Sequence, residues 1–280
     1  AKKIVVTGTP TKMKGIKLTE EQKNQIKLSL NLNIDLPIVL VFGGSQGARV
    51  INNAMSDIIK NKKYNGYQII WAAGPEQYKI IKEEFSKEQI DIDNINGVKI
   101  VPYIYNMEEI MNVSDIIVAR SGAMTLTEIA LVGKPAIFIP LPSMSANRQE
   151  DNARVMEKLG SAKVILNSEI NKDNLNSYIN DMIKDRNKLN QMGKLAGKIA
   201  TKDVEEKIYD EIKKSYHLTI GTKEEVKAYK NGIFSQYLLI DYYNFNIDKF
   251  KKLGTKDECV YMNNIIKKCN KIIEENNQAY

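Results

Sequence analysis

The sequence predicts an α/β protein in which a doubly wound parallel sheet is followed by a small all-helical module. Between residues 37 and 166, short runs that are apolar throughout alternate with amphipathic stretches. Apolar runs of this kind are typical of strands covered on both faces, and helices between them imply parallel pairing through right-handed crossovers. After residue 171 the apolar residues recur with helical spacing.

The composition of the 280 residues is that of an ordinary globular protein, with 43% hydrophobic and 27% charged residues. The longest apolar runs, 37–42 and 136–141, are far shorter than the ~20 residues needed to span a bilayer. Because the first ten residues reach a turn before an apolar stretch could form, we expect no secretory signal. Two cysteines form no disulfide framework, so we expect a cytoplasmic protein.

The charge and the ionisable residues exclude several kinds of chemistry. Although the net charge is +7, no basic arm or aromatic string concentrates it, so we expect no nucleic-acid partner. The single histidine, His217, lies outside the glycine motifs, which excludes a Ser-His-Asp triad and a multi-histidine zinc site. Cys259 and Cys269 stand ten residues apart without a CxxC spacing. We therefore expect neither a metal nor a cofactor.

Six strands and five helices are expected to build the sheet, in order along the chain. The strand candidates are Ile38–Phe42, Gln68–Ala73, Val98–Val101, Asp115–Ala119, Ala136–Pro140 and Ala162–Ile165. The helical patterns between them are Ala48–Lys60, Glu76–Lys87, Met107–Val113, Met124–Val132 and Arg148–Leu159. Ligands of such sheets bind outside the carboxyl ends of the strands, so we expect a site in the loops that follow strands.

The remainder of the chain is predicted to be helical. Apolar residues recur at helical spacing over 173–184 and again over 188–214. A different texture begins near residue 218, with aromatic and aliphatic residues on one face of 222–240 and of 256–276. We expect two domains, a sheet domain over residues 1–217 and a helical module of unknown role over 218–280.

A glycine-rich loop follows the first strand candidate. Gly43–Ala48, with the sequence GGSQGA, leaves that strand and opens a helix. Glycines let the backbone approach a ligand closely, and a helix start offers free N–H groups. The loop is neither a GxGxxG nor a Walker A motif, and a tight turn from strand to helix would explain it equally well.

The strongest motif, RSGAMTLTE, spans Arg120–Glu128 and follows the fourth strand candidate. We expect Ser121 to cap the helix and Gly122 to leave space above its first turn. A diphosphate would then accept hydrogen bonds from the backbone N–H groups of Ala123, Met124 and Thr125. Glu128 lies ~7–8 Å further along the axis, where its carboxylate would accept both hydroxyls of a ribose. The alternative is that Glu128 is a solvated helix residue.

A third loop leaves the fifth strand candidate through Pro140–Pro142 and reaches the amides Asn147, Gln149 and Asn152. Amide side chains offer donors and acceptors together, which suits sugar hydroxyls without adding charge. Capping of the helix that begins at Arg148 would explain them as well. Because three such loops follow strands of one sheet, we expect that they form a site for a nucleotide-diphosphate-sugar.

At these residues the chain resembles the C-terminal, donor-binding half of the MurG family of GT-B glycosyltransferases, whose halves are Rossmann-like. GGSQGA, RSGAMTLTEIA, GKPAIFIPLP and NRQEDNA occur in the family's order and spacing over residues 2–214. The resemblance implies an inverting, metal-independent transfer of GlcNAc from UDP-GlcNAc to lipid I, which makes lipid II for peptidoglycan and the cell wall. It also implies a peripheral location on the cytoplasmic side of the bacterial cell membrane.

The resemblance further implies roles for individual residues. Ser45 and Gln46 would contact the nucleotide-sugar, and the backbone of Ile104 would hold the uracil. The second motif would face the diphosphate and the ribose, while Gln149 and Asn152 would face the GlcNAc. The expected substrate-binding residues are Ser45, Gln46, Ile104, Arg120, Ser121, Gly122, Ala123, Met124, Thr125, Glu128, Asn147, Gln149 and Asn152.

The chain also departs from the family pattern. The family's usual Gly-Asn-Pro with a following arginine appears here as Gly8–Lys12 (GTPTK), which predicts a weaker phosphate contact, and Arg148 stands where relatives often have His or Gln. The family's N-terminal half, associated with acceptor activation, has no counterpart in the sequence, and no catalytic residue can be assigned. We expect this chain alone to bind UDP-GlcNAc without transferring it, and lipid I to bind only with an N-terminal half.

Other interpretations stay open. The chain would alternatively be the non-catalytic donor-binding subunit of a split UDP-sugar glycosyltransferase, recruited by a membrane-associated partner that docks on the helical module. Aromatic residues of that module, such as Tyr229, Tyr237 and Phe245, would serve the docking or form the module's own core. A UDP-GlcNAc 2-epimerase and a diacylglycerol galactosyltransferase use a similar nucleotide half.

Overall fold

The computed structural model describes residues 5–142, 148–216, 267 and 271. The chain divides into two units, Ala1–Glu205 and Glu206–Tyr280, and the sheet lies in the first. Asn147, His217, both cysteines and nearly all of the expected helical module lie outside the described residues. The expected domain boundary after residue 217 stays a prediction.

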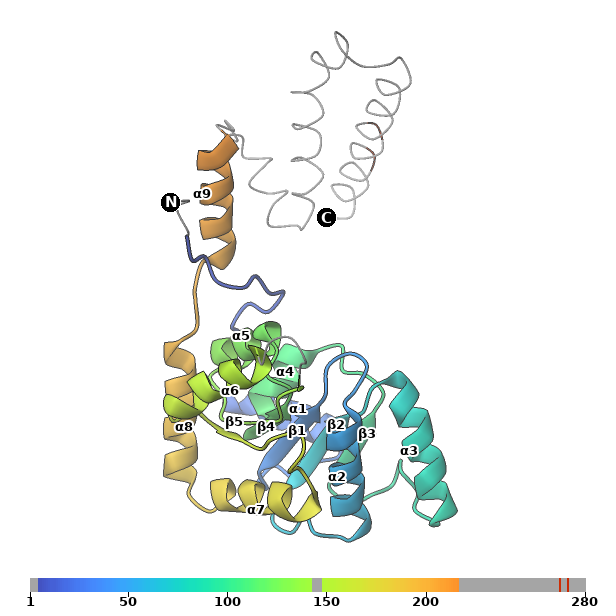
Figure 1. The fold of residues 1–280 in the computed structure, drawn as a ribbon. Coiled ribbons are helices and arrows are strands. Elements are labelled where there is room, and N and C mark those ends of the chain that lie inside the picture. Colours follow the sequence, from blue (N-terminus) through green and yellow to red (C-terminus); the bar gives the residue numbers. More distant parts are fainter. Residues whose placement is uncertain (1–4, 143–147, 217–266, 268–270, 272–280) are drawn as a thin grey trace. The chain divides into compact units, whose positions relative to one another are not determined.

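Six strands of the first unit form one parallel sheet in the order β3-β2-β1-β4-β5-β6 (Figure 1). They are β1 (Ile38–Phe42), β2 (Gln68–Ala72), β3 (Val98–Val101), β4 (Ile116–Ala119), β5 (Ala136–Phe138) and β6 (Ala162–Val164). Each agrees with a strand candidate to within two residues at either end, so the doubly wound parallel sheet is confirmed. The direction of winding reverses between β1 and β4, which pair directly with each other.

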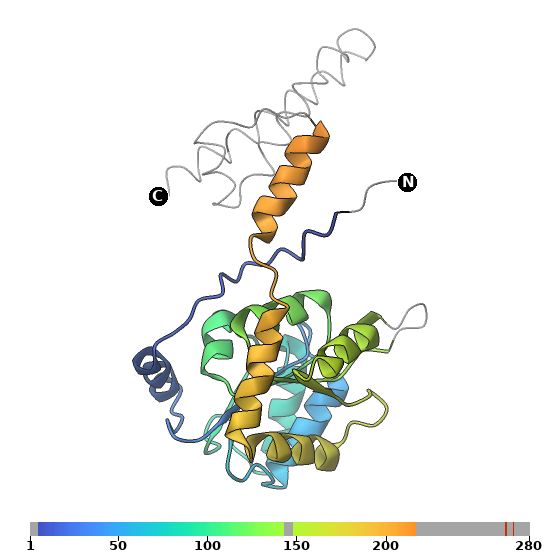
Figure 2. The same cartoon turned by 90° about the vertical axis from the view of Figure 1, so that its left-hand side faces the viewer.

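Helices cover both faces of the sheet, which explains why the central strands are apolar throughout (Figures 1 and 2). All five residues of β1 and of β2 are buried. One face packs against α2 (Arg49–Lys60), α3 (Pro75–Lys87) and α7 (Lys172–Ile183). The other face packs against α4 (Met107–Val113), α5 (Ala123–Val132) and α6 (Arg148–Lys158). Helix α8 (Arg186–Lys198) contributes Leu189 to the first apolar layer and Ala196 to the second.

Helix α1 (Glu20–Ser29) is not predicted from the sequence, because it is strongly polar and buries no residue. Its start is set locally by a capping box. The Thr19 hydroxyl accepts from the backbone N–H of Gln22, and the Gln22 side chain accepts from the backbone N–H of Thr19. Helix α1 packs against α4 on the second face of the sheet.

The helical pattern expected over 188–214 is interrupted, which corrects the prediction. Helix α8 ends at Lys198 and α9 (Val204–Tyr216) begins after Asp203, whose backbone is left-handed with φ 56°. The apolar spacing of Ile199 and Val204 continues across this break, so periodicity alone does not reveal it.

A Cβ on Gly193 of α8 would stand 2.6 Å from the carbonyl oxygen of Gly133, so α8 approaches the end of α5 at a position that only glycine fits.

Candidate functional site

The three motif loops leave the sheet side by side at its carboxyl edge. Strand β4 pairs with β1 and with β5, so that Phe42, Ala119 and Phe138 stand next to one another at the ends of their strands. The loops that follow therefore start from one edge, at the reversal between β1 and β4. Ligands of doubly wound sheets bind at this position. The topology thus brings together the segments that the sequence singles out.

The end of strand β2 holds the first loop, Gly43–Ala48, in place. Gly47 has φ +76°, and a Cβ there would stand 2.0 Å from the carbonyl oxygen of Ala73, so the turn requires glycine. The buried Asn52 side chain donates to the same carbonyl at 2.9 Å and accepts from the indole N–H of Trp71 at 3.1 Å. The turn from strand to helix is therefore tight, while ligand binding by this loop stays a prediction.

Two other glycines, Gly44 and Gly122, face open space. A Cβ on either would meet no atom of the described residues within 4 Å. Ser45 and Gln46, which follow Gly44, are exposed. The room that a ligand needs to approach the backbone thus exists at both the first and the second motif.

Helix α5 begins at Ala123, one residue later than it would if Ser121 were its N-cap. Gly122 is the N-cap, with φ −65° and ψ 151°, and no side chain caps the helix. Ser121 is fully buried, and its hydroxyl donates to the backbone carbonyl of Gln149 at 2.6 Å, so the predicted capping by Ser121 is wrong. The first N–H groups of a helix have no intrahelical acceptor, and Ala123 and Met124 are exposed. The start of α5 therefore offers donors that no side chain caps.

One further hydrogen bond joins the second motif to the third, and another closes the third motif on itself. The Asn152 side-chain nitrogen donates to the Ser121 carbonyl at 3.1 Å, and the Leu141 N–H donates to the Gln149 side-chain oxygen at 3.0 Å. These bonds do not use the second polar atom of either amide, Nε2 of Gln149 and Oδ1 of Asn152. Asn152 thus ties the start of α6 to the second motif, and Gln149 ties it to Leu141 of its own loop.

Arg120 ties three loops of the carboxyl edge together. Its Nη1 donates to the carbonyl oxygens of Ile139 (2.9 Å) and Pro140 (3.1 Å) and to Oδ1 of Asn167 (2.8 Å). Burial of the guanidinium lowers the pKa of Arg120 below its ordinary value. Since Nη1 is committed to the protein, a substrate contact of Arg120 would have to come from its other nitrogens.

Glu128 lies on α5, about one and a half turns beyond Ala123, the first residue of the helix, and is half-buried. Burial raises the pKa of its carboxyl, while the hydroxyl of Thr11, which donates to Oε1 at 3.1 Å, lowers it. Thr11 is 117 residues away in the sequence. Because its carboxylate is half-buried and hydrogen-bonded, Glu128 is not simply a solvated helix residue.

Ile104 follows strand β3, and its side chain is buried in the second apolar layer. Its neighbours Tyr103 and Tyr105 are exposed and contact each other edge to face, with ring centroids 5.0 Å apart. With the side chain buried, only the backbone of Ile104 can meet a ligand, as the predicted uracil contact requires.

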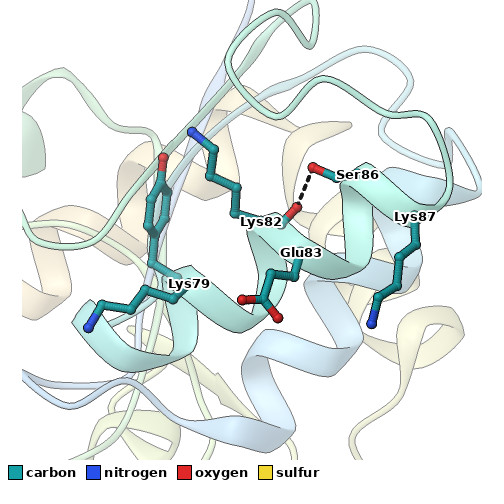
Figure 3. Close-up of a pocket in the computed structure, with 6 residues that line it drawn as sticks. Lys79, Lys82, Glu83, Ser86 and Lys87 are labelled. Atoms are coloured by element: carbon teal, nitrogen blue, oxygen red, sulfur yellow. Dashed lines mark hydrogen bonds between the residues drawn. The ribbon is translucent and has the colours of Figure 1, made fainter.

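A separate hollow on α3 is lined by six residues of that one helix, Tyr78, Lys79, Lys82, Glu83, Ser86 and Lys87 (Figure 3). Lys79 and Lys82 form ion pairs with Glu76 and Asp93. None of the lining residues belongs to a loop that follows a strand, so the hollow is not part of the candidate site.

Among the described residues, no three His, Cys, Asp or Glu side chains gather as a metal would require, and no helix is long and apolar enough to cross a bilayer.

Comparison with known families identifies the sheet unit. The family described as the glycosyltransferase family 28 C-terminal domain matches residues 38–208, which include all six strands and the three motif loops. The chain belongs to glycosyltransferase family 28. This assignment confirms the resemblance noted in the motifs and agrees with the sheet order and its helical layers.

Curated relatives of this family 28 chain are named UDP-N-acetylglucosamine--N-acetylmuramyl-(pentapeptide) pyrophosphoryl-undecaprenol N-acetylglucosamine transferase. The protein of Acetivibrio thermocellus is 38% identical over 212 residues, which cover 75% of this chain and 55% of the relative. That of a Thermoanaerobacter species is 39% identical over 211 residues, or 75% and 56%. The crystal structure of Acinetobacter baumannii MurG is 25% identical with a TM-score of 0.57, covering 69% of this chain and 52% of that one. The chain spans little more than half the length of these proteins.

Three residues that support the candidate site through hydrogen bonds are not identified from the sequence: Thr11, Asn52 and Asn167. Each forms a hydrogen bond with a residue that is distant in the sequence, namely Glu128, Ala73 and Arg120 respectively. The departure of Gly8–Lys12 from the family pattern is the one signal that points to the segment containing Thr11.

Proposed function

We propose that this family 28 chain binds UDP-GlcNAc as the donor half of a MurG-type glycosyltransferase. One observation carries the proposal: the uncapped start of α5 and the half-buried carboxylate of Glu128 lie about one and a half turns apart on one helix. That spacing suits a diphosphate at the helix start and the ribose of the same nucleotide beside Glu128. Relatives that are 38% and 39% identical and are named GlcNAc transferases support this choice of donor.

The diphosphate would be bound by the backbone rather than by charged side chains. The N–H groups of Ala123, Met124 and Thr125 form the first turn of α5, and the helix dipole favours an anion there. The open space beside Gly44 and Gly122 permits the close approach that such bonds need.

The two ends of the donor would meet different loops. The uracil would bind the backbone of Ile104 after strand β3, and Ser45 and Gln46 would contact the nucleotide-sugar from the first loop. The GlcNAc hydroxyls would bind Nε2 of Gln149 and Oδ1 of Asn152, the amide atoms that do not take part in the bonds to Leu141 and Ser121.

In the transfer reaction, the acceptor hydroxyl attacks the anomeric carbon of GlcNAc from the face opposite UDP, and the bond to the UDP oxygen breaks. The configuration therefore inverts, the hydroxyl proton passes to a base, and UDP leaves with additional negative charge. The start of α5 would stabilise that charge without rearranging, because its N–H groups are already in place. We assign no base among the residues of this chain.

The acceptor would be lipid I, as the relatives' names indicate, and the product lipid II, formed at the cytoplasmic face of the cell membrane. We expect the 280-residue chain alone to bind the donor and to form little or no lipid II. Lipid II production by the purified chain from lipid I and UDP-GlcNAc would contradict this expectation. A pull-down with and without residues 218–280 tests for a membrane-associated partner, and an unchanged set of bound proteins would exclude docking on that segment.

Calorimetric titration with UDP-GlcNAc, UDP-galactose and UDP tests the donor assignment. Glu128→Gln should weaken UDP binding by about 1.5–3 kcal/mol, because a charge-assisted pair of hydrogen bonds to the ribose is lost. Glu76→Gln is the matched control, since Glu76 is exposed and paired with Lys79 on α3. Unchanged UDP affinity of Glu128→Gln would overturn the ribose assignment, and equal affinity for both UDP-sugars would overturn selection of GlcNAc by this chain.

A further inference from the structure

The segment of residues 11–16 is bound to two helices through their carboxylates. On α4, Glu108 accepts the backbone N–H of Lys14 at 3.1 Å and that of Ile16 at 2.8 Å, one with each oxygen. On α5, Glu128 accepts the hydroxyl of Thr11 at 3.1 Å. The side chain of Asn112, also on α4, donates to the Ile16 carbonyl at 3.2 Å. The segment is therefore anchored at one end to α4, and its other end contacts α5.

The bond from Thr11 acts on the carboxylate that we place beside the ribose. A glutamate side chain has several rotatable bonds, and a hydrogen bond to one carboxylate oxygen restricts its orientation. The threonine hydroxyl is uncharged, so it orients Glu128 and leaves the negative charge of the carboxylate in place. A lysine at this position would neutralise that charge. An ionised carboxylate accepts about four hydrogen bonds, so acceptor positions remain for a diol.

We propose that Thr11 is a positioning residue: its hydroxyl orients the Glu128 carboxylate to accept both hydroxyls of the ribose, and Glu108 anchors the segment that presents Thr11. This inference rests on the proposed function, because it needs the ribose beside Glu128. The benefit is preorganisation. The carboxylate loses its rotational freedom on folding, so that less is lost when the nucleotide binds.

The test compares calorimetric affinities for UDP and for 2′,3′-dideoxyuridine diphosphate, which lacks the diol. Thr11→Val removes the hydroxyl and keeps the branched shape of the side chain. We expect it to weaken UDP binding about three- to tenfold and to leave binding of the dideoxy nucleotide unchanged. Thr11→Ser should restore UDP binding. Thr7→Val is the matched control, because the Thr7 hydroxyl donates only to the neighbouring Gly8 carbonyl among the bonds described, and it should bind both nucleotides like the parent.

Equal weakening of both nucleotides by Thr11→Val, or no weakening of UDP, would overturn the proposal. Glu128→Gln is measured in parallel, so that a failure of the role of Thr11 can be distinguished from a failure of the proposed function. If Glu128→Gln weakens UDP and Thr11→Val does not, only the role of Thr11 is wrong; if neither weakens UDP, the ribose assignment itself is wrong. Glu108→Ala leaves Thr11 and Glu128 intact and is a second variant, for which we expect the same loss confined to UDP.

Discussion

The hydroxyl of Ser121 donates a 2.6 Å hydrogen bond to the backbone carbonyl of Gln149, which joins the loop before α5 to the first turn of α6. The Asn152 side chain returns from α6 to the carbonyl of Ser121 at 3.1 Å. Ser121 is fully buried, so its bond is costly to lose. The diphosphate end and the sugar end of the proposed donor site are thereby held as one unit.

Ser121→Ala should lower the free energy of unfolding by about 1–3 kcal/mol, because the hydrogen bond of a fully buried hydroxyl is lost and the half-buried Gln149 carbonyl loses that donor. It should also weaken UDP-GlcNAc more than UDP, since the sugar is expected beside α6. Urea denaturation and calorimetry measure the two effects. Ser86→Ala is the control: its exposed hydroxyl donates to the Lys82 carbonyl, and its loss should cost less than about 0.5 kcal/mol. Equal weakening of both ligands would contradict the coupling.

Asn52→Ala should lower the free energy of unfolding by about 2–4 kcal/mol, because the indole N–H of Trp71 and the carbonyl of Ala73 both lose a buried partner. Trp71 is the single tryptophan, so its fluorescence reports on the transition directly. Asn61→Ala, an exposed position at the end of the same helix, is the comparison. A cost at Asn52 no larger than at Asn61 would show that the first loop does not depend on this bond.

The affinity for UDP-GlcNAc should depend on the ionisation of Glu128. The ionised carboxylate binds the ribose, so affinity falls as the pH falls toward the pKa of Glu128. Because burial raises that pKa, with Thr11 opposing in part, the loss should begin at a higher pH than the ordinary value of 4.5 implies. UDP-GlcNAc suits this measurement, because the terminal phosphate of UDP itself titrates near pH ~6. Glu128→Gln should flatten the profile, and parallel profiles of variant and parent would contradict the prediction.

Lys134 makes stability depend on pH in the alkaline range. Its ammonium group is buried and donates to the carbonyl oxygens of Asn112 (2.8 Å) and Ser114 (2.6 Å), and burial lowers the pKa of Lys134 from 10.5 to about 8. Between these two values the unfolded chain binds the proton and the folded chain does not. Stability should therefore rise with pH across that window, with a slope of up to about 1.4 kcal/mol per pH unit. This contribution is fully lost once the pH has fallen through about 8, where both states bind the proton.

Lys134→Met should abolish this slope, which urea denaturation between about pH 8 and 9.5 measures as the difference from the parent. The upper limit avoids the tyrosines, because burial raises the pKa of both Tyr64 and Tyr67 above 10.0 and their contribution has the opposite sign. The variant also leaves two carbonyl groups without their donor, so its stability should be lower at every pH. An identical slope in variant and parent would contradict the prediction.

The strands and most helices follow from local patterns. A run such as Ile38–Phe42 is apolar throughout because both faces of β1 are covered. The apolar run is visible in the sequence, so it is enough to predict the strand. The break between α8 and α9 is missed, since the apolar spacing runs on through Ile199 and Val204 and no glycine or proline lies between those two residues. Helix α1 is missed for the opposite reason, because none of its residues is fully buried and its start is defined by the cap at Thr19.

The sequence by itself determined the doubly wound sheet, the three loops at its carboxyl edge and the membership in glycosyltransferase family 28, because these depend on residues that are close together in the chain. Only the tertiary structure decided that Ser121 bonds to α6 instead of capping α5, that Arg120 is committed to neighbouring loops, and that Thr11 meets Glu128. Such contacts join positions up to 117 residues apart. They form when packing brings helices and loops together, and no periodicity or spacing within one segment encodes them.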